Sequence, residues 1–145
     1  SVSNFKPSQF ELLSSYVPYP LVINQVEISP LHLQVFEDGT MDSLMTRGLY
    51  PMAWSPLAGG DLFKGESERI KNVKNTLLGI GEHYGEDRLD TLAYAFLLSH
   101  PAKILPIVGS GKLERIKNAV DALKIKFTAE EWLSVYKASI GKNLP

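Results

Sequence analysis

Short apolar runs alternate along this chain with longer segments in which apolar residues recur every three or four positions. The short runs favour β-strands, and the longer periodic segments favour amphipathic helices. The strands are expected at residues 1–5, 21–28, 49–54 and 103–108. The helices are expected from residue 7 to about 17, from 40 to about 48, across 70–80, across 89–97, from about 113 and from about 129. This alternation predicts an α/β fold in one domain over residues 1–145, with a parallel sheet and right-handed crossovers.

Several helix boundaries are marked by residues that favour helix ends. Pro7 suits the first turn of a helix, and Thr128 with Glu131 forms the T-x-x-E pattern of a capping box. Gly85 separates the two long helical segments in the middle of the chain, and Asp87 is expected to cap the second of them. No short repeat, low-complexity run or obvious linker interrupts this order, which agrees with a single domain.

The stretch from residue 104 to 120 runs from an apolar strand through a glycine-rich turn directly into a helix. Gly109 and Gly111 let the backbone approach a ligand closely, and the helix start presents N–H groups without intrahelical partners. One apolar stripe of this helix is expected to be buried: Leu113, Ile116, Val120 and Leu123. Arg115 then lies on another face, from which it can reach a phosphate. The alternative is an ordinary surface loop followed by a solvated arginine.

Polar or aromatic residues stand at the carboxyl end of every expected strand. In chain order they are Ser3 and Asn4, Asn24 and Gln25, Trp54 and Ser55, and Gly109 and Ser110. In parallel α/β folds these ends meet on one rim, where ligands bind. Amides and hydroxyls suit a carboxamide, an indole suits a flat ring, and the last turn suits a phosphate, so together they match a nicotinamide nucleotide. Each also has a plain structural interpretation, because amides often satisfy loop backbone and tryptophans usually lie in cores.

Composition and charge exclude several other classes of protein. The 145 residues are 44% hydrophobic and 21% charged, with a net charge of -1, so nothing indicates a nucleic-acid or anionic-membrane partner. No run is long enough for a transmembrane helix, and no signal segment opens the chain. The absence of cysteine excludes disulfides and thiolate chemistry and favours a cytoplasmic protein. Because the chain opens with Ser1 at the end of an apolar strand, it is interpreted as a piece of a longer protein.

Four motifs together resemble the C-terminal half of an aldo-keto reductase. They are Ser-Val-Ser-Asn-Phe at residues 1–5, Asn-Gln-Val-Glu at 24–27, Ala-Trp-Ser-Pro-Leu-Ala-Gly-Gly at 53–60, and Pro-Ile-Val-Gly-Ser at 106–110 with Arg115. The match spans essentially the whole chain in order, and Ala-Trp-Ser-Pro-Leu is typical of bacterial oxidoreductases of this family. The resemblance implies part of a (β/α)8 barrel, a TIM barrel, from an enzyme that reduces small aldehydes or ketones to alcohols with NADPH.

The resemblance also implies roles for particular residues at the nicotinamide end of the cofactor. Ser3 and Asn4 match the pair that the family places on the nicotinamide carboxamide, and Gln25 matches their partner on the next strand. Trp54 matches the aromatic residue that stacks on the nicotinamide ring and leaves one face open for hydride transfer.

The phosphate end of the cofactor is implied in the same way. Ser55, Leu57 and Gly59 match the loop around the pyrophosphate, and Ser110 and Arg115 match the residues that hold the adenosine 2′-phosphate. Two positions depart from the family pattern. Gly109 stands where many members carry a lysine, and Asn118, also taken as a cofactor residue, follows Arg115 by three residues, while Ala119 takes the place four residues after it. These departures leave the choice between NADPH and NADH open.

The catalytic aspartate, tyrosine, lysine and histidine of the family belong to its N-terminal half and have no match here, so no catalytic residue is expected. The tyrosines and histidines are interpreted as core, rim or surface residues, without metal-ligand spacing: Tyr16, Tyr19, Tyr50, Tyr84, Tyr94, Tyr136, His32, His83 and His100. The chain is therefore expected to be inactive alone. Its open sheet edges are expected to be covered by self-association or by an N-terminal half, or to be relieved by a rearrangement of the strand at Ser1. Two alternatives remain: a non-enzymatic regulatory or interaction module derived from this fold, and an unrelated phosphate-binding barrel.

Overall fold

Four short parallel strands form the sheet at the centre of the molecule. The computed structural model describes residues 1–141, and its strands are β1 (Val2–Ser3), β2 (Asn24–Glu27), β3 (Met52–Trp54) and β4 (Leu105–Pro106). They pair in the order β1-β2-β3-β4, with Val26 opposite Ala53 and Ala53 opposite Pro106. This sheet with flanking helices confirms the predicted α/β class. Sequential order with helical crossovers is the arrangement of a partial barrel.

The strands are shorter than the apolar runs that predicted them. Of the run 21–28 only Asn24–Glu27 is paired as strand, and of the run 103–108 only Leu105–Pro106. Lys103 has a φ of 53°, outside the strand region, and after Pro106 the Ile107 N–H still donates to the Ala53 carbonyl of β3 at 2.8 Å. An apolar run indicates burial, whereas a strand also needs a paired neighbour.

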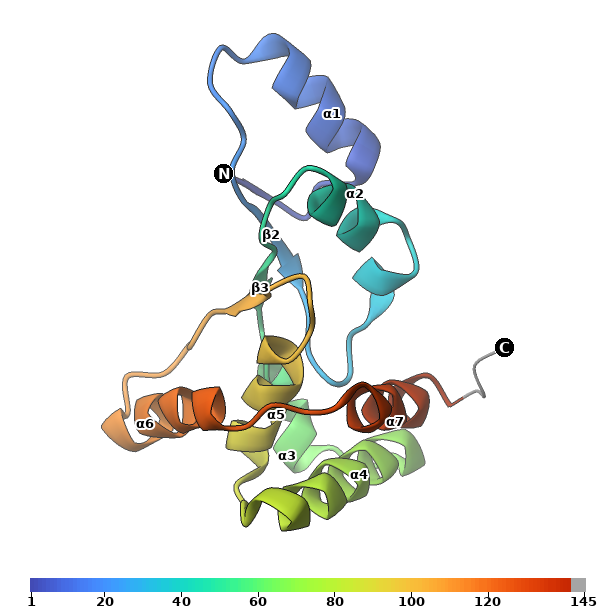
Figure 1. The fold of residues 1–145 in the computed structure, drawn as a ribbon, viewed down its shortest axis with the longest axis vertical. Coiled ribbons are helices and arrows are strands. Elements are labelled where there is room, and N and C mark those ends of the chain that lie inside the picture. The colour runs from blue at the N-terminus through green and yellow to red at the C-terminus, as the bar shows by residue number, and fades with distance from the viewer. Residues whose placement is uncertain (142–145) are drawn as a thin grey trace.

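Helices surround the sheet unevenly. In chain order the structure has α1 (Pro7–Tyr16), η1 (Gln34–Phe36), α2 (Thr40–Thr46), η2 (Ala58–Gly60), α3 (Asp61–Lys64), α4 (Glu68–Tyr84), α5 (Leu89–Leu98), α6 (Leu113–Asp121), η3 (Ala122–Lys124) and α7 (Ala129–Ile140). Figure 1 shows α1 and α2 at one end of the molecule and α3 to α7 gathered at the other. No helix within residues 1–141 has the length and apolarity needed to cross a membrane.

Local boundary signals predicted three helix ends correctly and one wrongly. Pro7 is the first residue of α1. The Thr128 hydroxyl accepts from the Glu131 N–H at 3.2 Å, and the Glu131 carboxylate accepts from the Thr128 N–H at 2.9 Å, so the capping box is confirmed. Gly85 ends α4 with a φ of 65°. The prediction for Asp87 is wrong, because the residue before α5 is Arg88 and its side chain is engaged with Glu86 instead.

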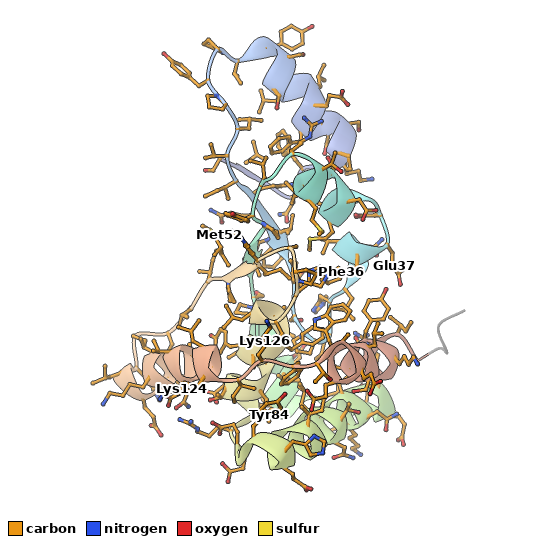
Figure 2. The ribbon with its side chains drawn as sticks, viewed as in Figure 1. Phe36, Glu37, Met52, Tyr84, Lys124 and Lys126 are labelled. Atoms are coloured by element: carbon orange, nitrogen blue, oxygen red, sulfur yellow. The ribbon has the colours of Figure 1, made fainter. Side chains whose placement is uncertain are left out.

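The core is built around α5. Every residue of this helix from Thr91 to Leu97 is buried, which is why its sequence is apolar on all sides. Phe96 stacks on Trp132 of α7 with ring centroids 4.9 Å apart, and the Trp132 indole donates to the Phe96 carbonyl at 3.1 Å. Phe36 packs edge-on against the same indole, and Figure 2 shows it between the sheet and α7. The packed core around α5 thus gives the helix that borders the loops after β3 and β4 a fixed position.

The apolar stripe along α6 and η3, which was predicted to be buried, is exposed. Its four residues are between 39% and 70% exposed: Leu113, Ile116, Val120 and Leu123. The helix packs on α5 through the small buried residues Ala119 and Ala122 and through the polar side chain of Asn118. No element within residues 1–141 covers the stripe. The prediction that this stripe is buried is therefore wrong.

Candidate functional site

The ends of β1 and β3 and the second residue of β2 bring four predicted residues together. The prediction that Asn24 and Gln25 stand at the carboxyl end of their strand is wrong, because β2 begins at Asn24 and runs on to Glu27. The Trp54 indole N–H donates to the Asn4 side-chain oxygen at 3.0 Å, which links the end of β3 to the end of β1. The Ser3 hydroxyl donates to the backbone oxygen of Gln25 at 3.2 Å, and Ser3 and Gln25 are register partners. Asn4 itself has a φ of 58°, a conformation that L-residues rarely adopt. We call Ser3, Asn4, Gln25 and Trp54 the strand-end group.

Asn24, beside this group, has a structural role. It is almost fully buried, and its side-chain oxygen accepts from the Phe5 N–H at 3.2 Å while its amide donates to the Phe5 oxygen at 2.8 Å. Both ends of the side chain are therefore occupied with the backbone that leaves β1. This is the plain interpretation that the sequence left open for amides at strand ends.

Next to Trp54 the chain opens into a cavity of about 570 Å³. Its walls come from the loop after β3, the end of α3, the first turns of α5, and the segment that joins β4 to α6. The lining residues are Ser55, Pro56, Leu57, Gly59, Gly60, Phe63, Lys64, Asp90, Tyr94, Ile107, Gly109, Ser110 and Arg115. We call this space the loop cavity.

Five of the predicted cofactor residues line the loop cavity. They come from the motif at residues 53–60 and from the segment 106–115: Ser55, Leu57, Gly59, Ser110 and Arg115. The loop after β3 turns sharply, with left-handed φ values at Ser55, Ala58, Gly59 and Gly60. A Cβ at Gly59 or Gly60 would meet no atom within 4 Å, so glycine there serves the backbone conformation and not the space. Such a cluster of unusual φ values is typical of functional loops.

The cavity carries two cations and one carboxylate. Arg115 in the first turn of α6 and Lys64 at the end of α3 supply positive charge, while Asp90 in the first turn of α5 supplies negative charge. The N-terminal end of α6 adds free backbone N–H groups. The cations and the helix start therefore favour an anion at one side of the cavity.

Tyr94 lies one turn after Asp90 on the same face of α5 and is almost fully buried. Burial raises the pKa of its hydroxyl, and the charge of Asp90 adds to this while Arg115 opposes it. The phenol therefore stays protonated at neutral pH and presents a flat, neutral wall.

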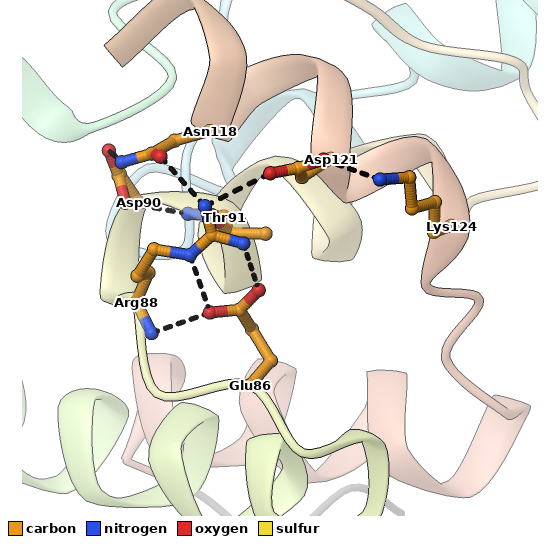
Figure 3. A network of polar contacts seen from close by, with 7 residues as sticks. All are labelled: Glu86, Arg88, Asp90, Thr91, Asn118, Asp121 and Lys124. Carbon is orange, nitrogen blue, oxygen red and sulfur yellow. Dashed lines mark hydrogen bonds and ion pairs between the residues drawn. The ribbon is translucent and has the colours of Figure 1, made fainter. Parts of the chain in front are cut away.

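Asn118 does not line the cavity but lies behind it in a polar network (Figure 3). Its amide nitrogen donates to Asp90 Oδ2 at 2.9 Å, and its oxygen accepts from Arg88 Nη1 at 2.9 Å. Arg88 also forms a two-pronged ion pair with Glu86, with contacts of 2.6 and 2.8 Å, and reaches Asp121 at 3.0 Å. The hydrogen bonds from Arg88 hold the pKa of Glu86 below its usual range. Both polar atoms of Asn118 are thus used within the protein.

Sequence reasoning missed four polar or aromatic residues of this cavity: Phe63, Lys64, Asp90 and Tyr94. Lys64 follows the glycine-rich loop by four residues, and Asp90 is an isolated acid at the start of an otherwise apolar helix. These features indicate a binding site only weakly, because neither Lys64 nor Asp90 stands at the end of a strand. Among residues 1–141 no three histidine, aspartate or glutamate side chains are grouped as around a metal ion.

The chain resembles known proteins over nearly its whole length. The aldo/keto reductase family model matches residues 1–140. The chain is 42% identical to the uncharacterized oxidoreductase YcsN of Bacillus subtilis and to the oxidoreductase YdhF of Escherichia coli, over 99% of this chain and 48% of each relative. It is 42% identical to a 6-dehydroglucose reductase of Agrobacterium fabrum over 99% of this chain and 47% of that protein.

A solved structure of similar fold is the thermostable aldo-keto reductase Tm1743, with a TM-score of 0.82 and 26% identity over 95% of this chain and 47% of that one. The chain therefore spans about half the length of the relatives it matches. Since the family match covers nearly all of its residues, this chain belongs to the aldo/keto reductase family.

Proposed function

We propose that this chain is the nicotinamide-nucleotide-binding part of an aldo-keto reductase that reduces small aldehydes or ketones with NADPH. We take residues 1–145 to be the C-terminal half of the barrel. The observation that carries the proposal is the loop cavity, which is lined by the loop that directly follows Trp54 and by Ser110 and Arg115. Members of this family typically use NAD(P)H, and such a cofactor needs an aromatic surface for its ring, which Trp54 offers, and cations for its phosphates, which Arg115 and Lys64 offer in the cavity.

The strand-end group offers complementary partners for a nicotinamide carboxamide. The Asn4 oxygen already accepts from Trp54, so its amide nitrogen is the group that can donate to the carboxamide oxygen. The Ser3 hydroxyl already donates to the Gln25 backbone, so its oxygen can accept from the carboxamide nitrogen. The bond to Asn4 also fixes the plane of the Trp54 indole, against which the nicotinamide ring would stack.

The loop cavity suits the phosphates of the same ligand. In the proposal Ser55, Leu57 and Gly59 border the pyrophosphate, and Ser110 and Arg115 hold the 2′-phosphate of the adenosine. Lys64, which the sequence did not single out, adds a second cation on the same cavity. Asn118 supports the site from behind, since its own polar atoms are occupied by Asp90 and Arg88.

We further propose that this chain alone does not turn over substrate. Carbonyl reduction needs a proton donor beside the carbonyl oxygen, and no residue here matches the catalytic residues of the family. The exposed stripe of α6 and the free edges of β1 and β4 are the surfaces that the remaining strands and helices of a barrel would cover. In the proposal an N-terminal half supplies them, and self-association covers them when that half is missing.

The test is a titration of the chain with NADPH and NADH, followed by tryptophan fluorescence. Trp54 lies at the site, whereas Trp132 is stacked on Phe96 in the core, so a Trp54→Phe variant shows which indole reports binding. We expect quenching by NADPH, and we expect Arg115→Ala to weaken NADPH binding about tenfold or more while leaving NADH binding unchanged. Lys117→Ala is the matched control, because it removes a cation from the same helix outside the cavity.

Two results would contradict the proposal. One is the absence of any nucleotide binding at millimolar concentration. The other is a loss of NADPH binding in Lys117→Ala as large as that in Arg115→Ala, because the effect would then be one of net charge. Adding a separately expressed N-terminal half should restore carbonyl reduction, and binding without turnover would favour an interaction module instead.

A further inference from the structure

One carboxylate lies in a cavity whose other charged groups are cations. Asp90 is half-buried in the first turn of α5, and it shares the loop cavity with Arg115 and Lys64. The two cations favour a phosphate, whereas a carboxylate repels one. Asp90 must therefore face a part of the ligand that is neutral and donates hydrogen bonds.

The position of the Asp90 carboxylate is fixed from both sides. One oxygen accepts from the Thr91 N–H at 3.0 Å, and the other accepts from the Asn118 amide at 2.9 Å (Figure 3). The orientation of Asn118 is set in turn, because its oxygen accepts from Arg88. Each carboxylate oxygen can accept more than one hydrogen bond, so acceptor capacity remains for a ligand.

The wall beside Asp90 is aromatic. Tyr94 follows it by one helical turn on the same face of α5, and Phe63 of α3 lines the same cavity. A fixed acceptor next to flat apolar surface suits a planar base that packs on its face and donates from its edge. A ribose hydroxyl needs the acceptor but not the flat wall.

We propose that Asp90 accepts a hydrogen bond from the exocyclic amino group of adenine and makes this site selective for adenine over 6-oxo purines. The inference rests on the proposed function, because it concerns the adenosine end of the same nucleotide. Asn118 is a positioning residue in this scheme: it holds the Asp90 carboxylate in place and does not itself line the cavity. A 6-oxo base has a carbonyl oxygen where adenine has its amino group. That oxygen would face the Asp90 carboxylate, so two acceptors would oppose each other without a proton between them.

The experiment compares NADPH with deamino-NADPH, which carries hypoxanthine in place of adenine, by the same fluorescence titration. We expect the unmodified chain to bind NADPH about tenfold or more tightly than the analogue. In Asp90→Asn the side chain gains a donor, so NADPH binding should weaken about tenfold while analogue binding stays equal or tightens. Asp42→Asn is the matched control, because Asp42 occupies the first turn of α2 outside the cavity, and it should keep the preference of the unmodified chain.

Three results would overturn the inference. The unmodified chain binding both nucleotides within about twofold is decisive even where Asp90→Asn fails to fold. If a folded Asp90→Asn variant loses affinity equally for both nucleotides, Asp90 has only a structural role. If NADH is titrated as well and Asp90→Asn weakens the binding of NADH alone, Asp90 lies at the ribose 2′-hydroxyl and not at the base. If no nucleotide binds at all, the proposed function fails and takes this inference with it, whereas binding without base discrimination defeats the inference alone.

Discussion

Two glycines in α4 occupy very different surroundings although they stand only two positions apart. Gly81 is buried, and a Cβ there would overlap the backbone carbonyl of Glu86 and lie 2.8 Å from a Leu92 methyl carbon. Gly79 is exposed, and a Cβ there would meet nothing within 4 Å. The first glycine is required by the close approach of the chain entering α5, and the second is not.

This contrast predicts opposite effects of the same substitution. Gly81→Ala should lower the free energy of unfolding by about 2 kcal/mol, because the clash is with backbone that cannot move aside. Gly79→Ala should raise it by up to about 1 kcal/mol, because alanine restricts the unfolded chain and favours helix. Urea unfolding followed by circular dichroism measures both, and shifts of the same sign would contradict the packing described for α4 and α5.

At the scale of elements, Glu131 ties the start of α7 to the end of α4. Its carboxylate accepts from the Thr128 N–H at 2.9 Å and from the Tyr84 hydroxyl at 2.8 Å, and it lies 3.0 Å from His83 Nδ1. The Tyr84 hydroxyl is also 2.8 Å from the Lys126 oxygen, just before α7, and Figure 2 marks both residues. One side chain therefore serves as helix cap and as interhelical link.

The pKa of Glu131 reflects these contacts. Burial alone would raise the pKa of this carboxyl, but the hydrogen bonds from His83, the Thr128 backbone and Tyr84 outweigh it and hold the pKa below the usual range. The folded chain therefore takes up this proton at lower pH than the unfolded chain. The stability that Glu131 adds is complete above about pH 4.3 and is lost as the pH falls through the folded value.

We expect the unfolding free energy to fall between about pH 5 and pH 3, and Glu131→Gln to flatten that dependence. At neutral pH the variant should be less stable by about 1 kcal/mol, because its amide keeps the capping bond to the Thr128 N–H but replaces charge-assisted hydrogen bonds by weaker neutral ones. Glu130→Gln is the matched control, since Glu130 is the adjacent exposed carboxylate in the same helical turn. Equal flattening in both variants would mean that general acid titration, and not the Glu131 contacts, sets the slope.

At the scale of the whole molecule, the stripe on α6 is apolar surface without a cover among residues 1–141. We expect the chain to self-associate as its concentration rises, because burying such side chains is worth about 2 kcal/mol each. Val120→Lys with Leu123→Lys should weaken this association about tenfold or more while leaving the circular dichroism unchanged. Sedimentation velocity measures the mass. Leu78→Lys on α4 is the control, and a monodisperse monomer of the unmodified chain would defeat the prediction.

The α/β class and most helix positions followed from the sequence, because periodicity and capping depend on residues close in the chain. Thr128 and Glu131 form their capping box with each other, so the prediction needed no tertiary information. The predicted ends of the strands were less exact, because a strand ends where its pairing with another strand ends. Met52 of β3, for example, pairs with Leu105 of β4, which lies far away in the sequence. Periodicity also showed that α6 has an apolar face, but not whether anything covers it.

The candidate site divides in the same way. Nine of the ten predicted cofactor residues lie in the strand-end group or line the loop cavity, because the chain leaves parallel strands at one rim. Gln25, near the start of β2, joins them through its register with Ser3. Asn118 lies behind the cavity, since Arg88 and Asp90 claim both ends of its amide. Lys64, Asp90 and Tyr94 entered the cavity through the placement of α3 and α5, which no motif in the sequence encodes.

By itself the sequence determined the alternation of strands and helices, the family, and the residues at the strand ends, because these depend on local pattern and on motifs contiguous in the chain. Only the tertiary structure decided that Asp90 faces the cavity, that Asn118 supports it, and that the α6 stripe is left open. The reason is physical: which face of a helix meets its neighbour depends on elements distant in the chain, and small residues such as Ala119 and Ala122 allowed the closer packing.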